Sequence, residues 1–172
     1  MRGLSVLLFS VFLLGSILPA VAGERKARVI VGLGDSTTAG TPAFRSPLEA
    51  PPGGEGNPES QYGFWLMKRH SEWQFLNRGV NGERSDEILA RFDSDVLRVK
   101  PDMVIILAGV NDLYQGYPLE GIKNNLKRMY KKALDAGILV MACTVLPYNV
   151  STDADLYFTA SRNGFNPQAG SL

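Results

Sequence analysis

Apolar runs and amphipathic segments alternate along most of this chain. Four short, mainly apolar runs predict β-strands at residues 28–33, 73–76, 103–108 and 138–145. Between them, apolar residues recur at helical spacing and predict helices at residues 62–70, 85–96 and 119–134. Strands that are apolar on both faces and separated by such helices indicate a parallel sheet with helices on either side. The predicted fold class is therefore α/β, a doubly wound three-layer α/β/α sandwich.

Two segments interrupt this alternation. Residues 41–60 are rich in proline and glycine and follow the first predicted strand directly, so we expect a long loop that walls one side of a substrate cleft. Residues 151–172 contain no convincing strand and are predicted to form an irregular tail. At residue 85, a serine followed by two acidic residues is typical of a helix N-cap.

The N-terminal 22 residues have the features of a secretory signal peptide. Arg2 gives a positive start, residues 4–18 form an apolar run, and Ala20-Val21-Ala22 fits the small-x-small cleavage pattern. We expect a secreted or periplasmic protein with no stable membrane span after signal removal, and the alternative is an uncleaved anchor. The folded domain is then assigned to residues 23–150.

Composition narrows the classes of partner. A hydrophobic fraction of 45% and a charged fraction of 20% are ordinary for a globular domain. The net charge of +1 gives no electrostatic reason to expect binding to nucleic acid. The single cysteine, Cys143, excludes an intrachain disulfide and is expected to pack as a small hydrophobic side chain.

Three turns at predicted strand ends contain residues suited to chemistry. They are Gly34-Asp35-Ser36, the turn from Asn77 to Gly82, and Gly109-Val110-Asn111-Asp112. Each alone is weak, because glycine, asparagine and aspartate are common in turns. In an open parallel sheet, however, ligands bind at the carboxyl ends of the strands, and three such turns in succession are a specific pattern.

These three segments resemble the sequence blocks of the SGNH (GDSL) hydrolase family, over roughly residues 28–147. The resemblance implies a flavodoxin-like fold, with Ser36 as nucleophile and Asn111 as a side-chain donor to the oxyanion. Gly82 matches the glycine of the second block, and Gly79 is the rival for that position. It also implies a small-molecule ester or other acylated substrate, with no metal and no organic cofactor.

The expected chemistry explains these residue types. Attack of a serine hydroxyl on an ester carbonyl creates an oxyanion that preorganised N–H groups must stabilise. The backbone N–H groups of Ser36 and Gly82 and the side-chain amide of Asn111 are suited to this role. Asp35 and Asp112 are expected to connect loops through hydrogen bonds instead of transferring protons.

The family's catalytic Asp-x-x-His segment has no counterpart in this sequence. The only histidine, His70, is expected to cap the first long helix at the surface. The resemblance also implies a fifth strand that is missing here, which leaves one sheet edge open. The simplest explanation is a truncated or frameshifted reading of a longer gene.

Three functions follow as hypotheses. The first is a secreted ester hydrolase that forms an acyl-enzyme on Ser36 and is inactive if this chain is only a fragment. The second is a non-catalytic remnant of the same fold that binds acyl or carbohydrate ligands. The third is a nucleotide-binding domain, suggested by Gly32-x-Gly34, but Thr37 stands where the dinucleotide fingerprint needs glycine.

Overall fold

The computed structural model describes residues 27–145. The predicted signal peptide at residues 1–22 and the predicted tail at residues 151–172 lie outside the described residues. The strands are β1 (Arg28–Gly34), β2 (Phe44–Arg45), β3 (Glu55–Gly56), β4 (Trp73–Gly79), β5 (Met103–Leu107) and β6 (Leu139–Ala142). The helices are α1 (Ser36–Ala39), the 3₁₀ helix η1 (Pro58–Ser60), α2 (Tyr62–Arg69), α3 (Ser85–Ala90), the π-helix η2 (Asp93–Leu97), α4 (Val110–Tyr114) and α5 (Leu119–Asp135).

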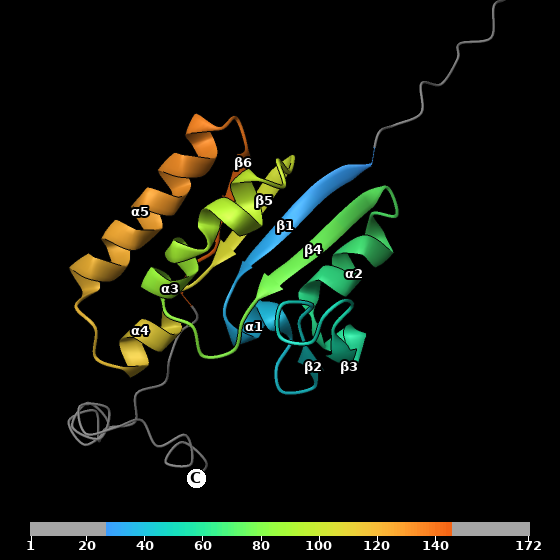
Figure 1. Ribbon diagram of the computed structural model, residues 1–172, viewed down its shortest axis with the longest axis horizontal. Helices are drawn as coiled ribbons and strands as arrows, with labels where there is room; N and C mark the ends of the chain where they lie inside the picture. Colours follow the sequence, from blue (N-terminus) through green and yellow to red (C-terminus); the bar gives the residue numbers. More distant parts are fainter. Residues whose placement is uncertain (1–26, 146–172) are drawn as a thin grey trace, which may run out of the picture.

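A parallel sheet with the strand order β4-β1-β5-β6 forms the centre of the described part of the chain (Figure 1). Each pair of neighbouring strands in it is parallel. Helix α2 lies on one side of the sheet, whereas α3 and α5 lie on the other. The predicted three-layer α/β/α sandwich is therefore confirmed.

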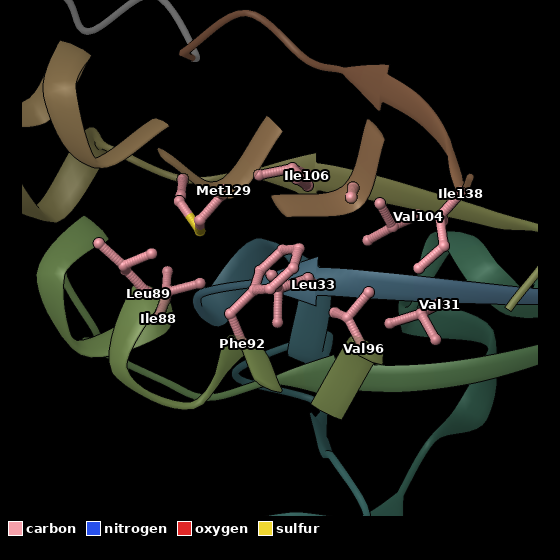
Figure 2. Close-up of a cluster of buried hydrophobic side chains, with 12 residues drawn as sticks. Val31, Leu33, Ile88, Leu89, Phe92, Val96, Val104, Ile106, Met129 and Ile138 are labelled. Atoms are coloured by element: carbon pink, nitrogen blue, oxygen red, sulfur yellow. The ribbon is translucent and has the colours of Figure 1, made fainter. Parts of the chain in front are cut away.

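Alternate residues of β1 pack into the two layers, which is why this strand has no polar face. Val31 and Leu33 join a cluster with Phe92 and Met129 on the side of α3 and α5 (Figure 2). Ile30, which precedes Val31, packs on the other side among residues of α2. The core thus fixes β1 from both faces, and with it the turn that follows.

The predicted helix at residues 85–96 is interrupted. Helix α3 ends at Ala90, and a π-helical turn carries Phe92 and Val96 into the core. Ser85 is the first residue of α3 and not its N-cap, so that prediction was wrong. Its hydroxyl donates a hydrogen bond to a carboxylate from α4 instead, and Glu87 accepts one from the backbone N–H of Arg84.

The proline- and glycine-rich segment contains structure that its composition did not predict. Strands β2 and β3 pair antiparallel within it, and Pro58 begins a 3₁₀ turn that leads into α2. Arg45 forms an exposed ion pair with Glu55 across the two strands. The segment is thus a small folded unit packed beside the carboxyl ends of β1 and β4 (Figure 1).

Strand β6 lies at one side of the sheet and is shorter than the predicted run. Its Leu139 and Met141 side chains are 61% and 48% exposed. Within residues 27–145 only β5 pairs with it, so the expected open edge is present in the described part of the chain. None of the helices in that part is both long enough and apolar enough to cross a membrane.

Two glycines provide a test of this packing. A Cβ on Gly79 would lie 2.1 Å from the backbone nitrogen of Ala39, whereas one on Gly121 in α5 would meet no atom within 4 Å. We expect Gly79→Ala to lower the free energy of unfolding by about 1–3 kcal/mol because backbone must move. Gly121→Ala should raise it by about 0.5–1 kcal/mol. Urea unfolding of both variants measures these free energies. Equal effects of the two substitutions would contradict the close packing of Gly79 against Ala39.

Candidate active site

The three chemistry-bearing turns lie along one edge of the sheet. The register sets Gly34, the last residue of β1, beside Gly79 of β4 and Leu107 of β5. Because the strands are parallel, the turns that follow them all emerge at this edge. A hydrogen bond of 3.1 Å from the Val80 N–H to the Gly34 carbonyl joins the second turn to the first.

Ser36 is the first residue of α1, directly after the buried Asp35. The Asp35 carboxylate caps this short helix by accepting a hydrogen bond of 3.0 Å from the Thr37 N–H. Ser36 is half-buried, and its own N–H has no partner among residues 27–145. The N–H is therefore available to a ligand at the site.

Beside Ser36, between the start of α1 and the start of α4, the surface has a shallow hollow that is open to solvent and encloses no room for a water-sized molecule. Its lining is Asp35, Thr37, Leu107, Ala108, Val110 and Val145. Most of these side chains are apolar, so the surface beside Ser36 is nonpolar on the side of α4.

Gly82 and Gly79 differ in the state of their N–H groups. The Gly79 N–H donates to the Asn77 side chain at 2.9 Å, so it has no hydrogen left for an oxyanion. Gly82 is exposed, and its N–H has no partner within the described residues. Its φ of +80° is a left-handed conformation that favours glycine, while the space beside it is open. The backbone conformation, more than the room for substrate, accounts for a glycine here.

Asn111 lies in the first turn of α4 and contacts the second turn directly. Its Nδ2 donates a hydrogen bond of 2.8 Å to the Glu83 carbonyl, one residue beyond Gly82. A side-chain amide carries two hydrogens, so one remains for a ligand. The structure thus joins the Asn111 side chain to the Gly82 turn, and the Gly82 turn to the end of β1.

Asp112 connects α4 to α3. Its two carboxylate oxygens accept hydrogen bonds from Ser85, at 2.8 Å from the backbone N–H and 2.6 Å from the hydroxyl. The Asp112 side chain is 1% exposed, so these bonds satisfy a buried carboxylate. Asp35 and Asp112 both make structural hydrogen bonds, as the sequence suggested.

Sequence reasoning missed the contribution of the proline-rich segment. The Glu49 carboxylate accepts hydrogen bonds from the Asn81 N–H at 3.0 Å and from the Ser46 N–H at 3.1 Å. The Ser46 hydroxyl donates to the Gly79 carbonyl at 2.5 Å. This segment therefore braces the turn that carries Gly82, and nothing in its composition identified the residues involved.

Arg91 was missed as well. It follows Ala90 at the end of α3, and its side chain is only 16% exposed. Its guanidinium donates to the Glu83 carboxylate at 2.7 Å and to the Gly34 carbonyl at 3.0 Å. The available clue was a charged residue three positions after Ile88, on the apolar side of the predicted helix.

His70 lies at the other end of the sheet from Ser36. It caps the C-terminus of α2 and stacks on Trp73, the first residue of β4, with ring centroids 4.1 Å apart. A strand of this length spans about 20 Å, which is far beyond hydrogen-bond reach of Ser36. Cys143 packs with the α2 side of the core, where burial raises the pKa of its thiol.

Comparison with known proteins connects this geometry to a family. The model of the GDSL-like Lipase/Acylhydrolase family matches residues 33–169. An arylesterase from Vibrio mimicus is 27% identical over 139 residues, 80% of this chain and 65% of the relative. An acetylxylan esterase from Geobacillus stearothermophilus is 31% identical over 72 residues, 42% of this chain and 32% of the relative.

Among solved structures, a putative lipolytic protein of the G-D-S-L family from Desulfitobacterium hafniense is similar, with a TM-score of 0.60 and 30% identity. The match covers 76% of this chain and 67% of that protein. For the two esterases named above, the matched part is shorter. It covers 65% of the arylesterase and 32% of the acetylxylan esterase, which is less than two thirds of each.

The buried Asp35 provides a test by pH. Burial raises the pKa of this carboxyl above its ordinary value of 3.8, and the nearby Asp112 charge acts in the same direction. The folded protein then holds the proton more tightly than the unfolded chain, so stability falls as pH rises from about 3.8 through the raised pKa. Asp35→Asn keeps an oxygen for the Thr37 N–H but cannot ionise, and it should lack this decline. If the unfolding free energies of the wild-type protein and Asp35→Asn run parallel from pH 3 to 7, the raised pKa of Asp35 is contradicted.

Proposed function

Because the chain belongs to the GDSL-like Lipase/Acylhydrolase family, we propose that it hydrolyses carboxylic esters through an acyl-enzyme on Ser36. The observation that carries this proposal is the hydrogen bond from Asn111 to the Glu83 carbonyl, which brings the third turn to the second. With the Val80–Gly34 bond, it connects all three turns that bear the proposed groups. An ester carbonyl beside Ser36 would then meet two backbone N–H groups and one side-chain amide.

The proposed reaction has two steps. The Ser36 oxygen adds to the ester carbonyl as its proton passes to a base, and the N–H groups of Ser36, Gly82 and Asn111 stabilise the resulting oxyanion. Collapse breaks the bond to the alcohol, which leaves with a proton, and the acyl group stays on Ser36. Water then attacks the acyl-enzyme in the same manner and releases the carboxylic acid.

The base is not supplied by His70, the only histidine in this chain, because it lies at the opposite end of β4. An oxyanion site without its base leaves a residual acceleration of about 10³–10⁴ over water. We therefore propose that a proton acceptor other than His70, such as a base in solution, takes the Ser36 proton. The competing function is binding of acyl or carbohydrate ligands without turnover, which the same position of His70 favours.

Two features guide the choice of substrate. The named relatives are an arylesterase and an acetylxylan esterase, and the hollow beside Ser36 is small. p-Nitrophenyl acetate, an aryl ester with a short acyl group, suits both features. The acyl group would face the apolar lining formed by Leu107, Ala108 and Val110.

We also propose that the protein is exported, on the evidence of the charged, apolar and small-residue pattern in residues 1–22. Expression of the full chain in a Gram-negative host should yield a periplasmic product shortened at Ala22. Fractionation and N-terminal sequencing measure this. A cytoplasmic product that retains Met1 would overturn the export proposal and leave the enzymatic one untouched.

The Ser36→Ala variant tests the catalytic proposal. The wild-type chain should hydrolyse p-nitrophenyl acetate slowly, and imidazole should accelerate it by acting as an external base. Ser36→Ala should reduce both rates to those of buffer and imidazole alone. Ser71→Ala is the matched control, since Ser71 is exposed in the turn between α2 and β4.

The two functions give different results in this assay. Rates that are equal in the wild-type protein and Ser36→Ala would remove Ser36 from any mechanism. If saturable binding of an acyl ligand accompanies that result, the protein is a binding module and not an esterase.

A further inference from the structure

Arg91 is the centre of a polar cluster beneath the candidate active site. We call this set, formed by Gly34, Arg78, Glu83, Arg91 and Asp95, the Arg91 cluster. The Arg91 guanidinium donates to the carbonyls of Gly34 at 3.0 Å and Arg78 at 2.9 Å. It also donates to the carboxylates of Glu83 at 2.7 Å and Asp95 at 2.6 Å. One side chain therefore holds the ends of β1 and β4 and the turn after β4.

Glu83 extends this cluster to the third turn. Its carboxylate pairs with Arg91, and its backbone carbonyl accepts the hydrogen bond from Asn111. Gly82 directly precedes it, and Gly34 lies two residues before Ser36. A continuous series of hydrogen bonds thus runs from Asn111 through Glu83 and Arg91 to the end of β1.

We propose that Glu83 and Arg91 are a positioning pair that sets the spacing of the three oxyanion donors on Ser36, Gly82 and Asn111. The pair itself touches no substrate, and the inference rests on the proposed function because it assigns those three groups to the oxyanion. Oxyanion stabilisation depends on donors that are already in place, so a small displacement of one turn has a large effect on rate.

The geometry favours positioning over simple charge pairing. The Glu83 and Arg91 side chains are 19% and 16% exposed, so solvent screens the pair only in part. Arg91 meets acceptors from three different segments with separate N–H groups of one rigid plane. A lysine keeps the positive charge but has a single nitrogen, which cannot span these acceptors.

The Glu83 carboxyl depends on Arg91 as its cationic partner. Burial raises the pKa of the Glu83 carboxyl, and the adjacent Arg91 opposes that shift. Loss of Arg91 would leave a partly buried carboxylate without its cation, beside Glu87 and Asp95. The turn that carries Gly82 would then relax towards solvent.

The first measurement is Ser36-dependent hydrolysis of p-nitrophenyl acetate in imidazole. Arg91→Lys should lower kcat by on the order of 10²-fold with little change in KM, since the donors act mainly on the transition state. Glu83→Gln should lose less, because its side-chain oxygen still accepts from Arg91 and its carbonyl still accepts from Asn111. The matched control is Asp93→Asn in the neighbouring π-helix η2, which removes an exposed ion pair with Lys132 of α5.

The second measurement needs no catalysis. Hydrogen–deuterium exchange should quicken in Arg91→Lys at residues 80–84 and at the start of α1. Exchange within β1 and β5 should remain as slow as in the wild-type protein and in Asp93→Asn. A role in overall stability alone would instead quicken exchange in those core strands.

The outcomes separate this inference from the proposed function. If Ser36→Ala leaves hydrolysis unchanged, the esterase proposal fails, and exchange at residues 80–84 still decides whether Arg91 positions the turn. An unchanged exchange pattern in Arg91→Lys overturns the positioning pair. An unchanged kcat in a Ser36-dependent assay, or faster exchange throughout the core, overturns it as well.

Discussion

The site depends on the parallel register that sets Gly34 beside Gly79 and Leu107. Three strands that point the same way deliver their following turns to one edge, where backbone N–H groups are no longer used by the sheet. The core reinforces that register from both faces, since alternate residues of β1 enter different apolar layers. Small displacements of β1 would change the position of Ser36 and its N–H together.

Hydrogen bonds to polar side chains hold the turns once the strands have placed them. Asp112 secures the start of α3, Glu49 secures Asn81, and Arg91 secures Gly34. Each carries a charge that is satisfied by backbone or side-chain partners, so removal of one leaves polar groups unpaired. The N–H groups proposed for the oxyanion, on Ser36 and Gly82, are left free of such partners in the described part of the chain.

Much of this architecture was predictable because it depends on local periodicity. Short, mainly apolar runs predicted the four parallel strands, and helical spacing predicted α2 and α5. The break after Ala90 was not predictable. The π-helical turn buries Phe92 and Val96, and a regular helix with the same spacing would also bury them, so the apolar pattern is the same in both cases. Nor was the β2–β3 pair, because two-residue strands carry almost no pattern.

The sequence by itself determined the fold class, the family and the three turns that carry Ser36, Gly82 and Asn111, because short motifs and periodic burial are local properties. Only the tertiary structure distinguished Gly82 from Gly79, since the answer depends on whether an N–H already has a partner. It also placed His70 far from Ser36 and brought Arg91 against both β1 and the Gly82 turn. Those relations join residues distant in sequence, and only the packing of strands and helices brings such residues into contact.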